Sequence, residues 1–153
     1  MRLSALCYIV LVLVLSSISA SAQFYDWSTP VTFFGPEQAD FNQSVRQVMF
    51  AWNDYDEPHD KAALQADAEW FKAHPNIKIY IDGYASSRGT LIYNLVLSQK
   101  RADYVKKFLL SHGVPESQIV FATGWGQLYP VCPGTDDECW SKNRRVRFEY
   151  AGN

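Results

Sequence analysis

Arg101 has the clearest capacity for ligand chemistry in this chain, because a planar guanidinium can donate two parallel hydrogen bonds to a carboxylate. It lies in a run whose apolar and small residues recur at helical spacings of three and four. The run reads Asn94-x-x-Leu97-Ser98-x-x-Arg101-Ala102-x-x-Val105-x-x-x-Leu109. By spacing alone, Arg101 is more often a solvated arginine on a helix than a ligand-binding residue. The residues around it must decide between these two interpretations.

The chain offers little for catalysis. His59, His74 and His112 lie at expected helix ends or in the turn before a helix, where imidazoles commonly act as caps or surface groups. None shares a motif with a Ser or Cys nucleophile, and no pair of carboxylates stands at a helical spacing within the run around Arg101. We therefore expect no enzymatic activity and no cofactor.

The first 22 residues have the features of a secretory signal peptide. Arg2 precedes an apolar run over residues 5–15, and residues 20–22 have the small-x-small form of a cleavage site. The apolar run is about eleven residues long, too short for the roughly 20 that cross a bilayer as a helix. Cys7 follows a leucine at the front of this run, so we do not expect lipid modification there.

Cys132 and Cys139 remain after the signal peptide and are separated by a Pro-Gly turn. In an exported chain, a close pair of this kind predicts one disulfide. The alternative is a metal site, but zinc takes four ligands and no histidine or second cysteine pair stands nearby. We therefore predict a disulfide and no metal.

Composition indicates one folded domain. The 153 residues carry a formal net charge of −2, without the basic excess that nucleic-acid binding requires. We divide the chain into a signal peptide (1–22), an N-terminal extension (23–43) and a folded domain (44–153). The extension shows neither helical nor strand periodicity and could contact a partner protein or a membrane through its aromatic residues. These are Phe24, Tyr25, Trp27, Phe33 and Phe34.

Hydrophobic periodicity predicts the elements that would position Arg101. They are a strand over 45–52, a helix capped by Asp60 and ending before His74, a strand over 77–81, a helix over 90–112, and strands over 119–123 and 145–150. In the first strand, the residues expected to face the core are Arg46, Val48, Phe50 and Trp52. This order predicts an α+β fold with two helices on one face of a small sheet.

The run from Asn94 to Leu109 closely resembles the helix signature of the OmpA-like peptidoglycan-binding domain family, which includes the C-terminal domain of OmpA and the peptidoglycan-associated lipoproteins. Two flanking segments support the resemblance, which covers about residues 45–150. They are Ile79-Tyr80-Ile81-Asp82-Gly83 and Asn143-Arg144-Arg145-Val146-x-Phe148. The resemblance implies a β-α-β-α-β-β sandwich with two helices on one face of a small mixed sheet. It also implies a non-catalytic domain of the cell envelope.

The ligand implied by the resemblance is the diaminopimelate-containing stem peptide of peptidoglycan. Diaminopimelate presents an ammonium and a carboxylate, so its pocket needs one cation and one anion. Arg101 occupies the arginine position of the family, and Asn53 matches a position that lines the pocket. Asn94 is expected to fix the loop before the helix through backbone hydrogen bonds. Arg144 is expected either to brace the sheet or to lie at the pocket rim.

The chain differs from the family at the residue expected to supply the negative charge of the pocket. The family loop usually reads Gly-His-Thr-Asp, whereas this chain has Gly83-Tyr84-Ala85-Ser86, with Ser86 fifteen residues before Arg101. A serine accepts a hydrogen bond from an ammonium but supplies no charge. Loss of one partner of a desolvated charge pair typically costs about 2–5 kcal/mol. Asp136 and Asp137 could reach over the site from the disulfide loop.

We therefore predict a periplasmic domain, associated with the cell wall or outer membrane, whose preference for the diaminopimelate peptide is weakened or altered. The alternative is a degenerate OmpA-like domain that serves as a periplasmic protein–protein interaction module. Tyr84 and Ser86 favour the alternative, while Asn94 and Arg101 favour wall binding.

Overall fold

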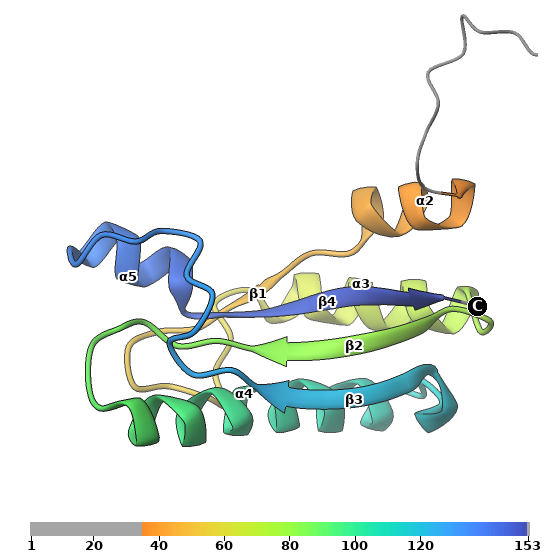
Figure 1. Cartoon of the computed structure of the whole chain (residues 1–153). Helices are drawn as coiled ribbons and strands as arrows, with labels where there is room; N and C mark the ends of the chain where they lie inside the picture. The colour runs from red at the N-terminus through yellow and green to blue at the C-terminus, as the bar shows by residue number, and fades with distance from the viewer. Residues whose placement is uncertain (1–34, 153) are drawn as a thin grey trace, which may run out of the picture. The chain divides into compact units, whose positions relative to one another are not determined.

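The computed structural model describes residues 35–152. The predicted signal peptide and all but the end of the predicted extension lie outside these residues. The described chain forms a four-stranded sheet in the order β1-β4-β2-β3 (Figure 1). The strands are β1 (Val48–Met49), β2 (Lys78–Gly83), β3 (Ile119–Gly124) and β4 (Arg145–Gly152).

The sheet is mixed, as predicted. Strand β4 pairs antiparallel with β1 and with β2, while β2 pairs parallel with β3. A parallel pair needs a long crossover, which helix α4 (Leu91–Ser111) and the short 3-10 helix η1 (Glu116–Gln118) supply. Helix α3 (Lys61–Ala73) leads into β2. Figure 1 shows α3 and α4 on one face of the sheet, which confirms the predicted α+β arrangement.

The core lies between these two helices and the sheet. Ile79 and Ile81 of β2 are fully buried, whereas Tyr80 between them is on the opposite face, as strand alternation requires. The helices contribute Leu64, Ala68 and Phe71 from α3, and Ala102, Val105, Phe108 and Leu109 from α4.

Side-chain caps fix where both long helices begin. One carboxylate oxygen of Asp60 accepts a hydrogen bond from the Ala63 N–H at 2.8 Å. The Thr90 hydroxyl accepts one from the Tyr93 N–H at 3.2 Å. Each bond satisfies a backbone donor that has no partner within its own helix. The predicted starts of both helices are confirmed.

The first strand is shorter than predicted. Only Val48–Met49 is regular strand, and Phe50 then forms an isolated bridge with Pro58. Trp52 is 60% exposed, so the prediction that it faces the core is wrong. The chain leaves the sheet after Phe50 and turns at Asn53, which has a positive φ of 61°. Regular alternation therefore cannot continue to Trp52.

The end of the predicted extension is helical. Helix α2 spans Pro36–Ser44, across the predicted boundary at residue 43, and proline occupies its first turn, where no N–H is needed. Phe41 is its one buried residue and contacts the rings of Trp70, Phe71 and Tyr150. Because α2 has only this one buried residue, it shows no amphipathic pattern, and hydrophobic periodicity therefore did not predict it.

The connection between β3 and β4 contains a further helix that was not predicted, α5 (Asp137–Asn143). Asp136 caps it by accepting a hydrogen bond from the Cys139 N–H at 2.8 Å. The predicted disulfide between Cys132 and Cys139 is present and ties the loop to the first turn of α5. The Asn143 amide also donates to the Cys132 carbonyl at 2.7 Å.

Asp67 of α3 is a carboxylate buried in the apolar layer. One of its oxygens accepts a hydrogen bond from the Arg46 N–H at 3.2 Å, and the other has no hydrogen-bond partner. Burial raises the pKa of Asp67 to about 6, more than the Arg46 hydrogen bond lowers it. Because the pKa is higher in the folded than in the unfolded chain, the folded state holds this proton more tightly.

This shift predicts that stability falls as pH rises from about 4 to about 6. The Asp67 proton contributes its full stabilisation below the pKa of Asp67 in the unfolded chain. This stabilisation is lost above the pKa of Asp67 in the folded chain, a difference of about 3 kcal/mol. Asp67→Asn removes the ionisation while keeping the acceptor for Arg46. Urea unfolding should therefore find this variant about 2–3 kcal/mol more stable than wild type near pH 7 and equal to it near pH 4. Parallel pH profiles for the two proteins would contradict this role.

Candidate functional site

Arg101 is fully buried at the middle of α4, with 0% of its surface exposed. Its guanidinium donates hydrogen bonds to three backbone carbonyls: Nε to Asp54 at 2.7 Å, Nη1 to Tyr84 at 2.9 Å and Nη2 to Ala51 at 3.0 Å. These carbonyls belong to the loop after β1 and the loop after β2. Arg101 therefore joins both loops to α4.

Within residues 35–152, Arg101 forms no ion pair with a carboxylate. Burial, and to a smaller extent the neighbouring cation Arg144, lower the pKa of Arg101 to about 10, while the Asp54 carboxylate acts in the opposite direction. A guanidinium has five N–H groups, so the three carbonyl bonds leave two N–H groups without a carbonyl acceptor. The site thus holds a buried cation that retains hydrogen-bonding capacity.

Ser86, which the sequence resemblance places at the aspartate position of the family, is also buried, with 4% exposed. It lies two residues beyond Tyr84, whose carbonyl is bound by Arg101. The loop that contains Ser86 is therefore held to Arg101 through the Tyr84 carbonyl.

The other predicted site residues have separate local roles. The side-chain oxygen of Asn53 accepts a hydrogen bond from the Tyr93 hydroxyl. Asn94 is buried and donates to the Gln127 side chain at 2.7 Å, so it ties α4 to the loop after β3. Arg144 donates from Nε to the Phe50 carbonyl at 3.1 Å and so braces the end of β1.

An open hollow of ≈ 240 Å³ lies between the loop after β1 and the first turns of α4, and its lining includes Lys100, the residue before Arg101. Its lining residues are Asn53, Tyr55, Tyr93, Val96, Leu97 and Lys100. The Lys100 ammonium lies 4.8 Å from the centre of the Tyr55 ring, within range of a cation–π interaction. Sequence reasoning missed Tyr55, Tyr93 and Lys100; the signal available was the spacing of Tyr93, Val96 and Lys100 along one helix face.

Asp54 is an acid near this hollow that sequence reasoning did not consider. Partial burial opposes its ionisation, but hydrogen bonds from the backbone N–H groups of Asp56 and Glu57 outweigh it and lower the pKa of Asp54 below its usual value. Asp54 therefore remains ionised at neutral pH, one residue from Asn53. It gives the site a negative charge that Ser86 does not.

Two tryptophans and an arginine form a cluster next to the Ser86 loop. The Arg88 guanidinium carbon lies 4.8 Å from the ring centre of Trp52 and 5.2 Å from that of Trp140. The Trp140 indole also donates to the Ser87 hydroxyl at 3.2 Å. Asp137, the first residue of α5, lies 3.9 Å from Arg88 and pairs with it.

Within residues 35–152 no group of three or more His, Cys, Asp or Glu side chains could hold a metal ion. None of the helices described is long and apolar enough to cross a membrane.

Comparison with known proteins relates this arrangement to one family. Residues 49–147 match the OmpA family. The peptidoglycan-associated lipoprotein of Haemophilus influenzae is 35% identical over 120 residues, covering 78% of this chain and 78% of the relative. That of Agrobacterium fabrum is 38% identical over 111 residues, covering 71% of this chain and 62% of the relative's length.

Solved structures agree. The crystal structure of the peptidoglycan-associated lipoprotein from Burkholderia pseudomallei superposes with a TM-score of 0.64 at 39% identity, covering 69% of this chain and 89% of that one. The C-terminal domain of Helicobacter pylori MotB has a TM-score of 0.63 at 21% identity, covering 71% of this chain and 86% of that one, and shows a shared fold. The sequence match over residues 49–147 and the fold together show that this chain belongs to the OmpA family.

Proposed function

We propose that this protein is a non-catalytic domain of the cell envelope that binds the diaminopimelate-containing stem peptide of peptidoglycan. The names of the relatives support peptidoglycan as the partner. The observation that carries the proposal is the buried Arg101, whose guanidinium joins the loops after β1 and β2 to α4 next to Lys100, a residue of the open hollow. Lacking the family aspartate at Ser86, the site binds this peptide with weakened or altered preference.

The carboxylate of diaminopimelate binds at Arg101 in this proposal. Because the guanidinium is fully buried and two of its three acceptors belong to the loop after β1, we propose that the ligand displaces the carbonyl of Ala51 or Asp54 to reach it. Exchange of a neutral carbonyl for a carboxylate is favourable, since hydrogen bonds between charged groups are stronger than those to neutral acceptors. Lys100 at the hollow adds a second cation for the approaching acid.

The ammonium of diaminopimelate has fewer partners. The Ser86 hydroxyl and the Asn53 side-chain oxygen can accept hydrogen bonds from it, and the ionised Asp54 supplies the nearest negative charge. Asn94 and Arg144 act indirectly, by holding the loop after β3 and the end of β1. The Asp54 carboxylate is not at position 86, so it should stabilise the bound ammonium less than an aspartate at position 86 would. We therefore expect weak binding of diaminopimelate.

The cellular setting follows from the same relatives. We propose a periplasmic location in association with the wall or outer membrane, reached through a cleaved signal peptide over residues 1–22. We further propose that the extension, residues 23–43, contacts an envelope protein.

A second candidate is a protein-interaction domain that has kept the fold and lost the ligand. The complete burial of Arg101 and the near-complete burial of Ser86 favour it, because neither side chain is accessible as the loops stand. A test of ligand binding separates the two candidates.

Titration of the ¹⁵N-labelled protein with free meso-diaminopimelate provides this test. We expect amide shifts confined to the loop after β1, the loop after β2 and the first turns of α4. L-Lysine is the matched control, since it differs from diaminopimelate by one carboxylate and should shift these signals far less. Equal shifts with both amino acids, or none with either, would favour the second candidate.

A further inference from the structure

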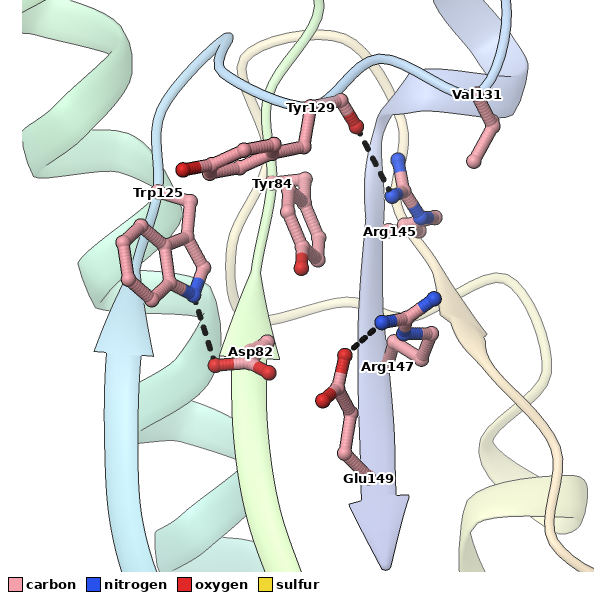
Figure 2. Close-up of a pocket in the computed structure, with 8 residues that line it drawn as sticks. All are labelled: Asp82, Tyr84, Trp125, Tyr129, Val131, Arg145, Arg147 and Glu149. Carbon is pink, nitrogen blue, oxygen red and sulfur yellow. Dashed lines mark hydrogen bonds and ion pairs between the residues drawn. The ribbon is translucent and has the colours of Figure 1, made fainter.

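The sheet face opposite α3 and α4 carries a hollow of ≈ 400 Å³ near the carboxyl ends of β2 and β3 (Figure 2). Its lining residues are Asp82, Tyr84, Trp125, Tyr129, Val131, Arg145, Arg147 and Glu149. The hollow is separate from the site at Arg101, which lies on the helix side of the sheet. Its volume falls within the range of small-ligand sites, about 300–1,000 Å³.

Arg145 is the exceptional residue of this hollow. It is only 2% exposed, and its one hydrogen bond runs from Nη2 to the Tyr129 carbonyl at 3.3 Å. Its Nε and Nη1 atoms are buried without a hydrogen-bond partner. The guanidinium carbon lies 4.0 Å from the centre of the Tyr84 ring, which supports the cation on one side.

The other charged groups around the hollow are paired. Arg147 forms an ion pair with Glu149, and Asp82 accepts a hydrogen bond from the Trp125 indole N–H at 2.8 Å. Figure 2 shows both interactions below Arg145. Among the charged residues that line the hollow, Arg145 alone has neither a counter-charge nor a full set of acceptors.

A buried cation with most of its donors unused is costly, and an incoming anion would relieve that cost. A carboxylate suits it because its two oxygens match one edge of the guanidinium fork. Around it, the Trp125 and Tyr129 rings lie 5.7 Å apart at 82° and offer flat apolar walls. Tyr129 holds its carbonyl against Arg145 from a left-handed conformation (φ 56°), which is costly for a residue with a side chain.

We propose that this hollow binds a carboxylate carried on a flat apolar body, with the carboxylate at Arg145 and the body against Trp125 and Tyr129. The carboxylate belongs either to a free organic acid or to the C-terminus of a peptide, which present the same group. This site is independent of peptidoglycan binding at Arg101.

Benzoate and benzamide test the proposal as a pair of the same size and shape, in which benzamide lacks the negative charge and replaces one acceptor oxygen by an NH2 donor. The readout is the indole N–H signal of Trp125 in a ¹H–¹⁵N spectrum, identified by its loss in Trp125→Phe. We expect benzoate to shift this signal saturably, with benzamide at least about tenfold weaker. N-acetylphenylalanine represents a peptide C-terminus, and comparison of its affinity with that of benzoate shows which source is preferred. Absence of a saturable shift with both acids would overturn the proposal.

Two variants connect binding to Arg145. Arg145→Gln removes the charge and should abolish the difference between benzoate and benzamide. Because Arg145 is buried, its replacement can destabilise the fold, so a second variant keeps Arg145 and changes Val131 to Glu. Val131 is exposed and lies above Arg145 in Figure 2. A carboxylate there should occupy Arg145 and weaken benzoate binding about tenfold or more, whereas Val131→Gln, which has nearly the same size without the charge, should weaken it far less. Equal binding by wild type and Val131→Glu would overturn the proposal.

Discussion

Replacement of Arg101 by alanine is expected to lower the free energy of unfolding by at least about 3 kcal/mol. The change removes three hydrogen bonds from a charged donor and leaves the carbonyls of Ala51, Asp54 and Tyr84 without it. A buried acceptor without a donor typically costs about 1–3 kcal/mol. Urea or thermal unfolding of the purified domain measures the loss.

Arg88→Ala is the matched control for this measurement. Arg88 is a half-exposed arginine whose contacts are ring faces and one distant acid, so its removal should cost less than about 1 kcal/mol. Equal stability of Arg101→Ala and wild type would contradict the structural role of Arg101. The expected loss also means that failure of Arg101→Ala to bind a ligand is evidence only if the variant remains folded.

Ser86→Asp is expected to strengthen binding of diaminopimelate by roughly thirtyfold, which corresponds to about 2 kcal/mol. The substitution places a carboxylate where the resemblance expects the aspartate of the family, two residues beyond the Tyr84 carbonyl that Arg101 binds. The new charge is buried, and we expect the Arg101 cation to offset part of its desolvation. Titration calorimetry with meso-diaminopimelate measures the change.

Ser86→Asn separates charge from shape in this experiment. It has nearly the size of aspartate and a similar acceptor but no negative charge, so it should give little or no gain. If Ser86→Asp also gives no gain while remaining folded, the geometry of the site, and not its charge alone, differs from the rest of the family.

Most of the fold was predictable because its signals are local. The caps at Asp60 and Thr90 and the helical spacing after each define α3 and α4 from neighbouring residues alone. The errors occurred where tertiary contacts determine where an element ends or whether it forms. Trp52 continues the alternation of Phe50, yet the positive φ of Asn53 takes the chain out of the sheet, and α2 depends on one contact made by Phe41.

The sequence indicates candidate residues for the site but not the connections between them. The helix pattern indicates Arg101, but nothing in it reveals that Arg101 binds carbonyls 17, 47 and 50 residues away. Backbone acceptors leave no trace in a sequence, because every residue has one. The surroundings of Arg145 could not be predicted for the same reason, because its hydrogen bond is to the backbone carbonyl of Tyr129.

The most direct test of the proposed function is co-sedimentation of the protein from Gln23 to Asn153 with insoluble sacculi of the diaminopimelate type. We predict that wild type sediments with the sacculi, that free meso-diaminopimelate releases it and that L-lysine does not. Ser86→Asp should sediment more completely than Ser86→Asn. A folded wild-type protein that stays in solution, or that sediments without any response to diaminopimelate, would contradict the account and identify a domain that has kept the fold without the ligand.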